Sequence, residues 1–301
     1  MTPTRSGTLY GAAAYLLWGL FPLYWPLLEP SGSLEVLAHR VLWSLVVVVV
    51  LLAVTRRTAG VRAAVADRRR LVQLGVAAVV IAVNWGTYIY GVTHERVVET
   101  SLGYFVNPIV TVLLGVLVLG ERLRPAQWTA LGAAGVAVAV LTVENGRPPW
   151  IALALAFSFG TYGLLKKTAG VGAVEGLAIE TAVLLPVGAL YVAYLGATGA
   201  GTFGSEAPGH AVLLALSGLV TAVPLLLFGA AASRIPLTTL GLLQYLAPTI
   251  QFVLGVTLFH EPLPLVKLLG FVLVWAGLAL FTIDLVRNAR RTARLAVAAP
   301  A

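Results

Sequence analysis

The sequence feature that most constrains the fold is a long uncharged stretch that contains a proline and that occurs twice. Residues 99–123 read ETSLGYFVNPIVTVLLGVLVLGERL and carry no charge from 100 to 120. As a helix, this stretch is long enough to cross the roughly 30 Å hydrocarbon core of a bilayer. A related stretch, TLGLLQYLAPTIQFVLGVTLFHEPL, covers residues 239–263. The sequence therefore predicts a duplicated membrane protein.

The informative matches between the two stretches are a proline, a glycine and a glutamate, because chance identities are common in helices rich in Ala, Leu and Val. They are Pro108 with Pro248, Gly115 with Gly255, and Glu121 with Glu261. A proline inside a helix removes one backbone hydrogen bond and kinks the helix. We expect both prolines to break their helices, either as hinges or only to shape packing. The two glutamates are interpreted as helix terminators.

The composition excludes a water-soluble globule. The chain is 59% hydrophobic and 11% charged, with a mean hydropathy of +0.93, whereas soluble domains carry about 25% charged residues. Backbone polar groups in lipid must be satisfied within the segment, so the apolar segments should be helices. Ten can be drawn, at 8–28, 36–55, 71–92, 99–119, 126–143, 149–165, 177–195, 211–231, 238–259 and 264–285.

Basic residues fix the expected orientation, because cytoplasmic loops are enriched in Lys and Arg. With the N-terminus inside, most of the 20 Lys and Arg fall on the cytoplasmic side. They are Arg5, Arg56, Arg57, Arg62, Arg68, Arg69, Arg70, Arg122, Arg124, Lys166, Lys167, Arg234, Arg287, Arg290, Arg291 and Arg294. Both termini are thus predicted to be cytoplasmic. The net charge of +8 needs no nucleic-acid partner.

Each half of the chain holds five predicted helices, an odd number, so the two copies should have opposite orientations in the membrane. We expect a first repeat at 7–145, a second at 147–285 and a basic cytoplasmic tail at 286–301. Inverted repeats of this kind recur in secondary transporters, whose substrate site lies near the midplane between the halves.

Several motifs resemble a known family. They are HRVLWS in helix 2, NWGTYIYGV in helix 3, ETSLGYFVNPI in helix 4, and LLQYLAPTIQFVLGV followed by HEPL in helix 9. These residues are similar to RarD-type proteins of the EamA branch of the drug/metabolite transporter superfamily. The resemblance implies a ten-helix permease of the bacterial inner membrane, all α, built from two inverted five-helix EamA repeats. It also implies a central cavity between helices 1–4 and 6–9. Members of the group are commonly described as chloramphenicol-sensitivity proteins.

Two ionisable residues within predicted spans are functional candidates, because charge is costly in lipid. Arg40 in helix 2 and Glu180 in helix 7 occupy equivalent places in the repeats. Inversion should separate their backbones by roughly 18 Å along the membrane normal, so direct contact is not expected. Arg40 suits an anionic or carbonyl group of the substrate, and Glu180 a cation or a coupling proton. The alternative is that each snorkels or caps a helix end.

Polar and aromatic side chains within the spans are predicted to line the cavity and bind substrate. Besides Arg40 and Glu180, they are Trp18, Asn84, Trp85, Tyr88, Tyr104, Asn107, Tyr162, Gln244, Tyr245 and Gln251, with Glu180, Pro108 and Pro248 as coupling or hinge residues. Such a lining suits a partly apolar organic solute. Aromatic residues also gather at membrane interfaces, which fits Trp25, Trp128 and Trp150 better than a ligand role.

Sequence signatures of catalysis are missing. There is no cysteine, the four histidines fall in separate regions, and no HExxH, Walker or GxSxG pattern occurs, so we predict neither an enzyme nor a cofactor. The leading hypothesis is a secondary permease for a small organic metabolite or drug that works by alternating access, with proton coupling as an option. The alternative is a membrane-embedded enzyme that acts on a lipid through His39 and Arg40. The expected partners are the solute and the bilayer. The resemblance also implies that helices 5 and 10 are packing elements or a homodimer contact.

Overall fold

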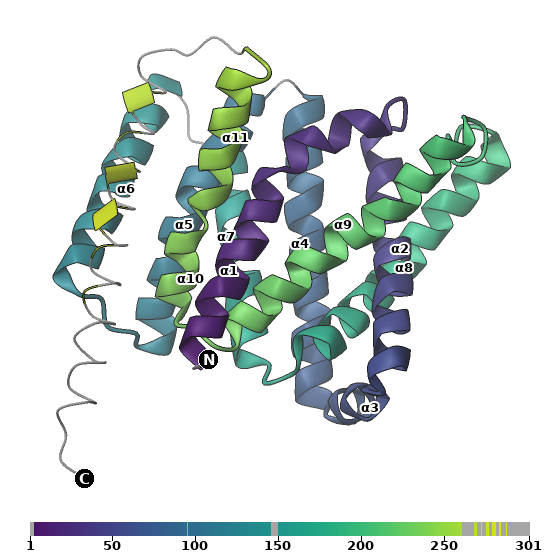
Figure 1. Cartoon of the computed structure of the whole chain (residues 1–301), viewed down its shortest axis with the longest axis horizontal. Coiled ribbons are helices and arrows are strands. Elements are labelled where there is room, and N and C mark those ends of the chain that lie inside the picture. The colour runs from purple at the N-terminus through teal and green to yellow at the C-terminus, as the bar shows by residue number, and fades with distance from the viewer. Residues whose placement is uncertain are drawn as a thin grey trace.

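The computed structural model describes residues 3–94, 96–145 and 150–260, with a few separate residues between 268 and 287. Within these residues the secondary structure is helical throughout (Figure 1). The α-helices are α1 (Pro3–Gly19), α2 (Ser33–Thr55), α3 (Thr58–Ala66), α4 (Arg68–Thr93), α5 (Val97–Leu119), α6 (Pro125–Asn145), α7 (Trp150–Thr168), α8 (Ala173–Thr198), α9 (Pro208–Ala232), α10 (Leu237–Leu243) and α11 (Leu246–Thr257).

The helices are apolar because they face lipid as well as each other. Within the described residues, α2, α4, α8, α9 and the stretch 237–257 are long and apolar enough to cross a membrane. Large hydrophobic side chains are exposed on the outer faces of the helices, for example Val54 at 76% and Leu117 at 77%. An apolar surface of this kind is rare on soluble monomers. The chain is therefore a multi-pass membrane protein.

The predicted segments correspond to helices over most of the described chain, with a correction at the end of the first span and one additional helix. The first segment was expected to run to residue 28, but α1 ends at Gly19 and two short 3-10 helices follow, Phe21–Leu23 and Trp25–Leu28. Each of these carries a proline in its first turn, which explains why the α-helix does not continue. Helix α3, a short helix in the basic connection before α4, was not predicted.

The ninth predicted segment is broken, but three residues earlier than its proline. It forms α10 and α11, which are separated at Gln244 and Tyr245. In a continuous helix, Pro248 would clash with the carbonyl of residue 244, and the break removes that clash. In α11 the proline lies in the first turn, where its missing N–H has no helical partner to lose. Pro108, by contrast, lies inside the uninterrupted helix α5.

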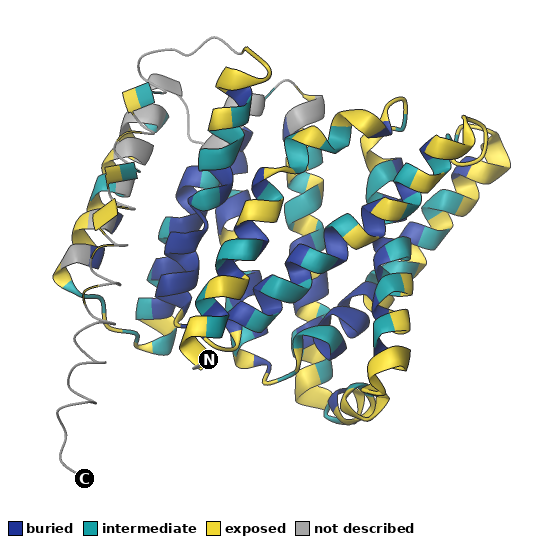
Figure 2. Cartoon of the chain, in the orientation of Figure 1, coloured by how far each residue is buried: buried dark blue, intermediate teal, exposed yellow. Residues whose placement is uncertain are grey.

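The helices pack as an interleaved bundle. Helix α2 lies against α8 and α9, α5 lies against α7 and α10, and α1 lies against α9 and α11. Helices α2 and α9 approach closely at Gly218, where an added Cβ would collide with the backbone of Trp43. Buried residues gather where α5, α7, α9 and α10 meet (Figure 2). The tenth predicted segment, 264–285, and Glu261 lie outside the described stretches, apart from isolated residues such as Trp275.

Candidate functional site

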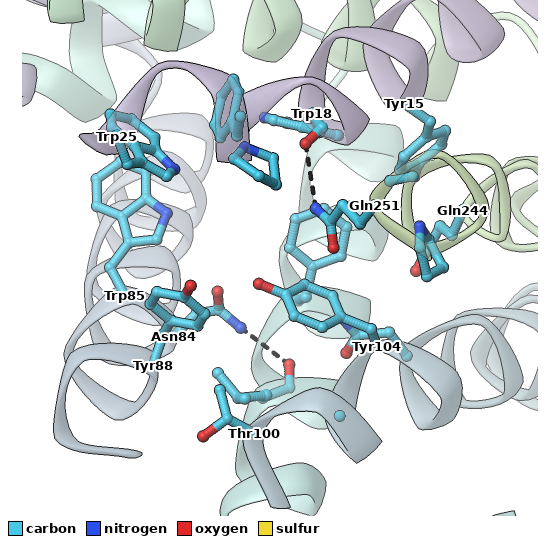
Figure 3. Close-up of a pocket in the computed structure, with 18 of the residues that line it drawn as sticks. Tyr15, Trp18, Trp25, Asn84, Trp85, Tyr88, Thr100, Tyr104, Gln244 and Gln251 are labelled. Carbon is cyan, nitrogen blue, oxygen red and sulfur yellow. Dashed lines mark hydrogen bonds between the residues drawn. The ribbon is translucent and has the colours of Figure 1, made fainter. Parts of the chain in front are cut away.

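A cavity of about 420 Å³ lies among α1, α4, α5, α7, α9 and α11, and Arg40 of α2 reaches it. Its size is within the range of small-molecule sites, which are mostly apolar with a few polar groups. Figure 3 shows Trp25 and Trp85 on one side of this space and Gln244 on the other. We call it the central cavity.

The structure brings together most of the residues that the sequence analysis selected. Those that line the central cavity are Trp18, Arg40, Asn84, Trp85, Tyr88, Tyr104, Asn107, Gln244, Pro248 and Gln251. They come from α1, α2, α4, α5 and the α10–α11 segment, so residues far apart in sequence share one space. Their role in substrate binding stays a prediction.

Four selected residues do not line the cavity. Tyr162 is fully buried and donates a hydrogen bond to Glu180 at 3.0 Å. Glu180 also accepts a hydrogen bond from Lys166. Tyr245 is buried among residues of α5 and α6, and its hydroxyl donates to the Phe105 carbonyl at 3.4 Å. Pro108 lies within α5 outside the cavity lining. We correct the predicted cavity lining for Tyr162, Glu180 and Tyr245, whose side chains contact neighbouring helices. Pro108 was predicted as a hinge, and that role stays a prediction.

Arg40 is held between two indole rings. Its guanidinium carbon lies 4.8 Å from the ring centroid of Trp25 and 5.0 Å from that of Trp85. Its Nε donates a hydrogen bond to Thr221 Oγ1 at 2.9 Å. Within the described part of the chain, Arg40 forms no ion pair with a carboxylate. The cavity therefore contains a cation whose charge is not neutralised by the described residues.

The amide side chains of the cavity hold its walls together. Asn84 donates to the Leu155 carbonyl and to Ser158 Oγ, each at 2.9 Å. Gln251 donates to the Trp18 carbonyl at 3.2 Å, as Figure 3 shows. Gln244, beside the helix break, donates to Thr111 Oγ1 at 2.8 Å. Each of these bonds joins two helices, so the amides fix the shape of the cavity.

Some cavity residues were not predicted. Trp25 was interpreted as a membrane-interface residue, but it lines the cavity and stacks on Arg40. Thr221 was not selected, although a buried hydroxyl in the middle of the apolar helix α9 is a signal that could have identified it. Tyr15, one turn before Trp18, lines the cavity as well.

The pair on which the lipid-enzyme alternative depended is separated in the structure. His39 stacks on Phe203, with ring centroids 4.8 Å apart, and is not part of the cavity lining. Arg40 turns into the cavity instead. Among the described residues, no group of three or more His, Cys, Asp or Glu side chains is placed to hold a metal ion.

A buried ion pair lies outside the lining of the central cavity. Lys166 Nζ of α7 is 2.8 Å from Glu180 Oε1 of α8, and the side chains are 5% and 3% exposed. Glu180 was expected to be free for a cation or a proton. The structure gives it a lysine and a tyrosine as partners, which the sequence analysis missed because Lys166 was assigned to a cytoplasmic loop.

The chain is similar to known proteins along most of its length. Residues 5–143 match the model of the EamA-like transporter family. The chain is 57% identical to Protein RarD of Streptomyces exfoliatus, covering 98% of this chain and 94% of that protein. It is 41% identical to Protein RarD of Escherichia coli (strain K12), covering 97% and 98%. It is also 40% identical to the uncharacterized transporter YojE of Bacillus subtilis (strain 168), covering 94% and 96%.

The fold has a counterpart among solved structures. One crystal structure, 20% identical in sequence, superposes with a TM-score of 0.70 and covers 92% of this chain and 98% of that chain. At this identity the likeness concerns the fold alone. The relatives, by contrast, match along nearly their whole length, and some of them are named as uncharacterized transporters. This chain therefore belongs to the EamA-like transporter family, within its RarD-type group, and is a membrane transporter.

Proposed function

We propose that the protein is a secondary transporter that binds an organic anion with an apolar, preferably aromatic, body in the central cavity. In this proposal the solute is exposed alternately to the two sides of the membrane, as the sequence analysis predicted. The observation that carries the proposal is Arg40, a cation that faces the cavity without a carboxylate partner among the described residues.

An unpaired cation is costly in a low-dielectric site, so it favours a ligand that supplies the missing negative charge. Arg40 donates one Nε hydrogen bond to Thr221, and its guanidinium has further N–H donors that can hold a carboxylate at two points. The rings of Trp25 and Trp85 restrict the guanidinium from both sides. A carboxylate or a strongly polarised carbonyl is the group that suits this arrangement.

The rest of the cavity suits an apolar body. Aromatic side chains such as Trp18, Tyr88 and Phe159 form its walls, and flat rings stack on such surfaces at centroid distances of 4.5–7 Å. The amides of Asn84, Gln244 and Gln251 already donate to backbone or side-chain groups, and the Oδ1 of Asn107 is a buried acceptor without a hydrogen-bond partner. The cavity therefore favours a solute with one anionic end rather than a sugar with many hydroxyls.

The packing supports the inverted repeat that alternating access requires. If residues 7–145 and 147–285 are the repeats, α1 corresponds to α7, α2 to α8, α4 to α9, and α5 to α10 with α11. The contact between α1 and α9 then corresponds to that between α7 and α4, and both pairs pack closely. Arg40 lies at the cavity, whereas its equivalent Glu180 lies outside the cavity lining, beside Lys166. Equivalent positions at opposite ends are what an inversion produces.

The proposed orientation of the protein in the membrane follows from its basic residues. The N-terminus and α3 lie at one end of the bundle, and the C-terminal end of α11 lies at the other (Figure 1). The central cavity includes Phe259, just beyond α11. With both termini in the cytoplasm of a bacterium, the cavity would face the outside of the inner membrane, and the structure would represent an outward-facing state.

Thermal stabilisation of the purified protein by a panel of solutes tests the proposal. A ligand that binds the folded state raises the unfolding midpoint by mass action. The panel pairs aryl carboxylates with their neutral amides, and it includes chloramphenicol because one relative is named a chloramphenicol-sensitive protein. We expect stabilisation by carboxylates above that by the amides. The best hit is then followed by flux into proteoliposomes.

Variants of Arg40 make the test specific. Arg40→Ala should weaken binding of the hit by roughly 10- to 100-fold, because a hydrogen bond to a charged group contributes about 1.5–3 kcal/mol. Arg40→Lys should keep part of the affinity, and Arg62→Gln, an exposed arginine outside the cavity, should keep all of it. Equal stabilisation of the wild type and Arg40→Ala by the hit would contradict the proposal.

Proton coupling, the finer option, is assigned to Glu180 in this proposal. Glu180 is buried, and it is the carboxylate at the repeat position equivalent to Arg40. A pH-dependent flux that becomes flat in Glu180→Gln would support the coupling. An identical pH dependence in the two proteins would remove Glu180 from that role.

A further inference from the structure

A second cavity of about 590 Å³ lies at the other end of the bundle, and cations dominate its charged lining. It is formed by the ends of α1, α2, α7 and α9 and by the connection from α7 to α8. Its charged lining residues are Arg57, Lys166, Lys167 and Arg234, and the described lining contains no carboxylate. We call this space the basic vestibule.

The vestibule and the central cavity use opposite ends of the same helices. Along α2, Arg40 reaches the central cavity and Arg57, just after the helix, lines the vestibule. Along α7, Phe159 lines the first and Lys166 the second. These two residues are seven apart, which is about 10 Å at 1.5 Å per residue. Only about two helical turns therefore separate the two spaces.

The barrier between them is a cluster of five aromatic rings, formed by Tyr15, Trp18, Phe159, Tyr162 and Phe228. Phe228 lies at its centre, with ring centroids 5.4 Å from Phe159, 5.7 Å from Trp18 and 5.7 Å from Tyr162. Phe228 and Tyr162 are fully buried. Tyr15, Trp18 and Phe159 also line the central cavity, so the cluster is the floor of that cavity.

Lys166 belongs both to the closed barrier and to the vestibule. Its Nζ donates a hydrogen bond to Glu180 Oε1. Glu180 also accepts a hydrogen bond from Tyr162 of the aromatic cluster. Its side chain passes between α8 and α9 at two glycines. A Cβ at Gly176 would lie 2.9 Å from Nζ, and one at Gly229 would lie 3.2 Å from Cε. The lysine thus extends from the vestibule wall to the base of the barrier.

We propose that the basic vestibule is a second binding site for the acidic group of the transported solute, on the cytoplasmic side, and that Lys166 links this site to the barrier. This inference rests on the proposed function. In it, a carboxylate that enters the vestibule competes with Glu180 for Lys166, and the loss of the Lys166–Glu180 pair removes the ionic link between α7 and α8 at the base of the barrier, which allows the barrier to open.

The charges of the vestibule favour this competition. Lys166 is paired with Glu180, and Lys167 lies 4.0 Å from Glu121. Arg57 and Arg234 have no carboxylate within ion-pair distance among the described residues, and Arg234 lies over the ring of Tyr10. The buried carboxylate of Glu175 lies against Gly172 of the lining, and it has one oxygen without a hydrogen-bond partner. Arg57 and Arg234 nevertheless have no ion-pair partner among the described residues, and they lie in the same lining as Lys166, whose ion pair an incoming anion can exchange.

The absence of cysteine from the sequence allows a direct test with single-cysteine variants. Ala230→Cys places a thiol in the vestibule, and Ala247→Cys places one in the central cavity. The purified full chain, reconstituted in phosphatidylcholine vesicles permeabilised to reagents, is labelled with a neutral maleimide with and without benzoate. The neutral analogue benzamide is the control ligand.

We expect benzoate to slow labelling at Ala230→Cys by at least about five-fold. The clustered positive charges of the vestibule raise the local concentration of the benzoate anion, and bound benzoate covers the thiol. Benzamide should have no such effect. Arg57→Gln and Arg234→Gln should remove the protection, and Arg62→Gln, an exposed cation outside the vestibule, should leave it. The absence of protection by benzoate, or equal protection by benzamide, would overturn the proposal.

Vesicles that contain phosphatidylglycerol distinguish a lipid headgroup from a free solute. If anionic lipid alone protects Ala230→Cys and benzoate adds nothing, the vestibule holds a lipid phosphate and the solute proposal is wrong. Continued protection by benzoate in both membranes supports it. Protection at Ala247→Cys reports the central cavity separately. If benzoate protects Ala247→Cys but not Ala230→Cys, the vestibule site is rejected and the proposed function stands.

Exchange of the two charges tests the shared role of Lys166. The double variant Lys166→Glu with Glu180→Lys keeps an ion pair but places a carboxylate at the vestibule. We expect its benzoate protection at Ala230→Cys to disappear. A purely structural pair would retain the protection. If the exchanged protein does not fold, the Arg57→Gln and Arg234→Gln variants still decide whether the vestibule binds benzoate, and without that binding the role of Lys166 is rejected as well.

Discussion

The carboxylate of Glu121 accepts a hydrogen bond from the backbone N–H of Leu237 at 2.7 Å, across 116 residues of sequence. Its other oxygen accepts a hydrogen bond from the N–H of Thr238 at 2.8 Å. A residue that follows α5 thus satisfies the first N–H groups of α10, a helix of only seven residues. From the sequence, Glu121 was interpreted as the terminator of its own helix. In the structure it also caps the N-terminus of α10.

Glu121→Ala should lower the free energy of unfolding by about 1–3 kcal/mol, because it leaves two N–H groups of α10 without their acceptor. Glu121→Gln keeps one acceptor oxygen and should cost less. The thermal unfolding midpoint in detergent measures both. Glu206→Ala removes an exposed carboxylate for which the structure shows no side-chain hydrogen bond and is the control. Equal midpoints for Glu121→Ala and Glu206→Ala would contradict the assignment.

Lys166→Met and Glu180→Gln should each destabilise the protein strongly, by about 3–5 kcal/mol, because each leaves an uncompensated partner in the core. The double variant should cost less than the sum of the two. A double-mutant cycle on thermal unfolding measures this coupling. Arg70→Gln removes one partner of an exposed ion pair, and we expect less than about 1 kcal/mol there. Additive effects at 166 and 180 would show that the two side chains do not depend on each other.

Gly218→Ala should destabilise the contact between α2 and α9 by about 1–3 kcal/mol, as overpacking typically does. A Cβ at this position meets the backbone of Trp43, which cannot move without shifting α2. Gly209→Ala, in the same helix but with open space around its Cβ, should be neutral or stabilising, because Ala is a better helix former. The relevant measurement is the difference between the two midpoints. A Gly218→Ala protein as stable as Gly209→Ala would disprove the close approach.

Thr221→Val should weaken binding of the solute several-fold without removing Arg40, because the Nε of Arg40 loses the acceptor that fixes its orientation. Thr221 is a positioning residue, so Arg40→Ala combined with Thr221→Val should be no worse than Arg40→Ala alone. Ser217→Ala is the matched control, since that hydroxyl bonds only the carbonyl of Leu214 in its own helix. Binding isotherms with the best ligand of the panel provide the comparison. Independent effects of Arg40→Ala and Thr221→Val would count against positioning.

Much of the helical architecture could be predicted because the apolar runs are long and their ends are marked. The runs around Val48 and Leu214 are uninterrupted and have no alternative to a helix in lipid. The ends of the helices were predicted less accurately. Two prolines at 22 and 26 forecast the early end of α1, but the apolar residues around them extended the predicted span. At the helix break near Gln244, the proline marked the region, and steric conflict placed the break one turn before it.

The site could be predicted in type but not in its pairings. Polar and aromatic residues in apolar helices identified most of the cavity lining, including Asn84 and Gln244. The partners of Glu180 could not be identified in this way. Lys166 was assigned to a loop by charge counting, but its long side chain returns into the bundle. Which helix face meets which depends on three-dimensional packing that no single-sequence pattern encodes.

The hydrogen bonds of the structure also have a consequence for how the chain is assembled. Tyr24 donates to the carbonyl of Leu213, and Gln251 donates to that of Trp18, so groups in each half are satisfied by the other. A ribosome releases the first half long before these partners exist. The helices of the first half are therefore in the bilayer before these polar groups have their hydrogen-bond partners. We expect a first half expressed alone to be degraded unless the second half is supplied in the same cell.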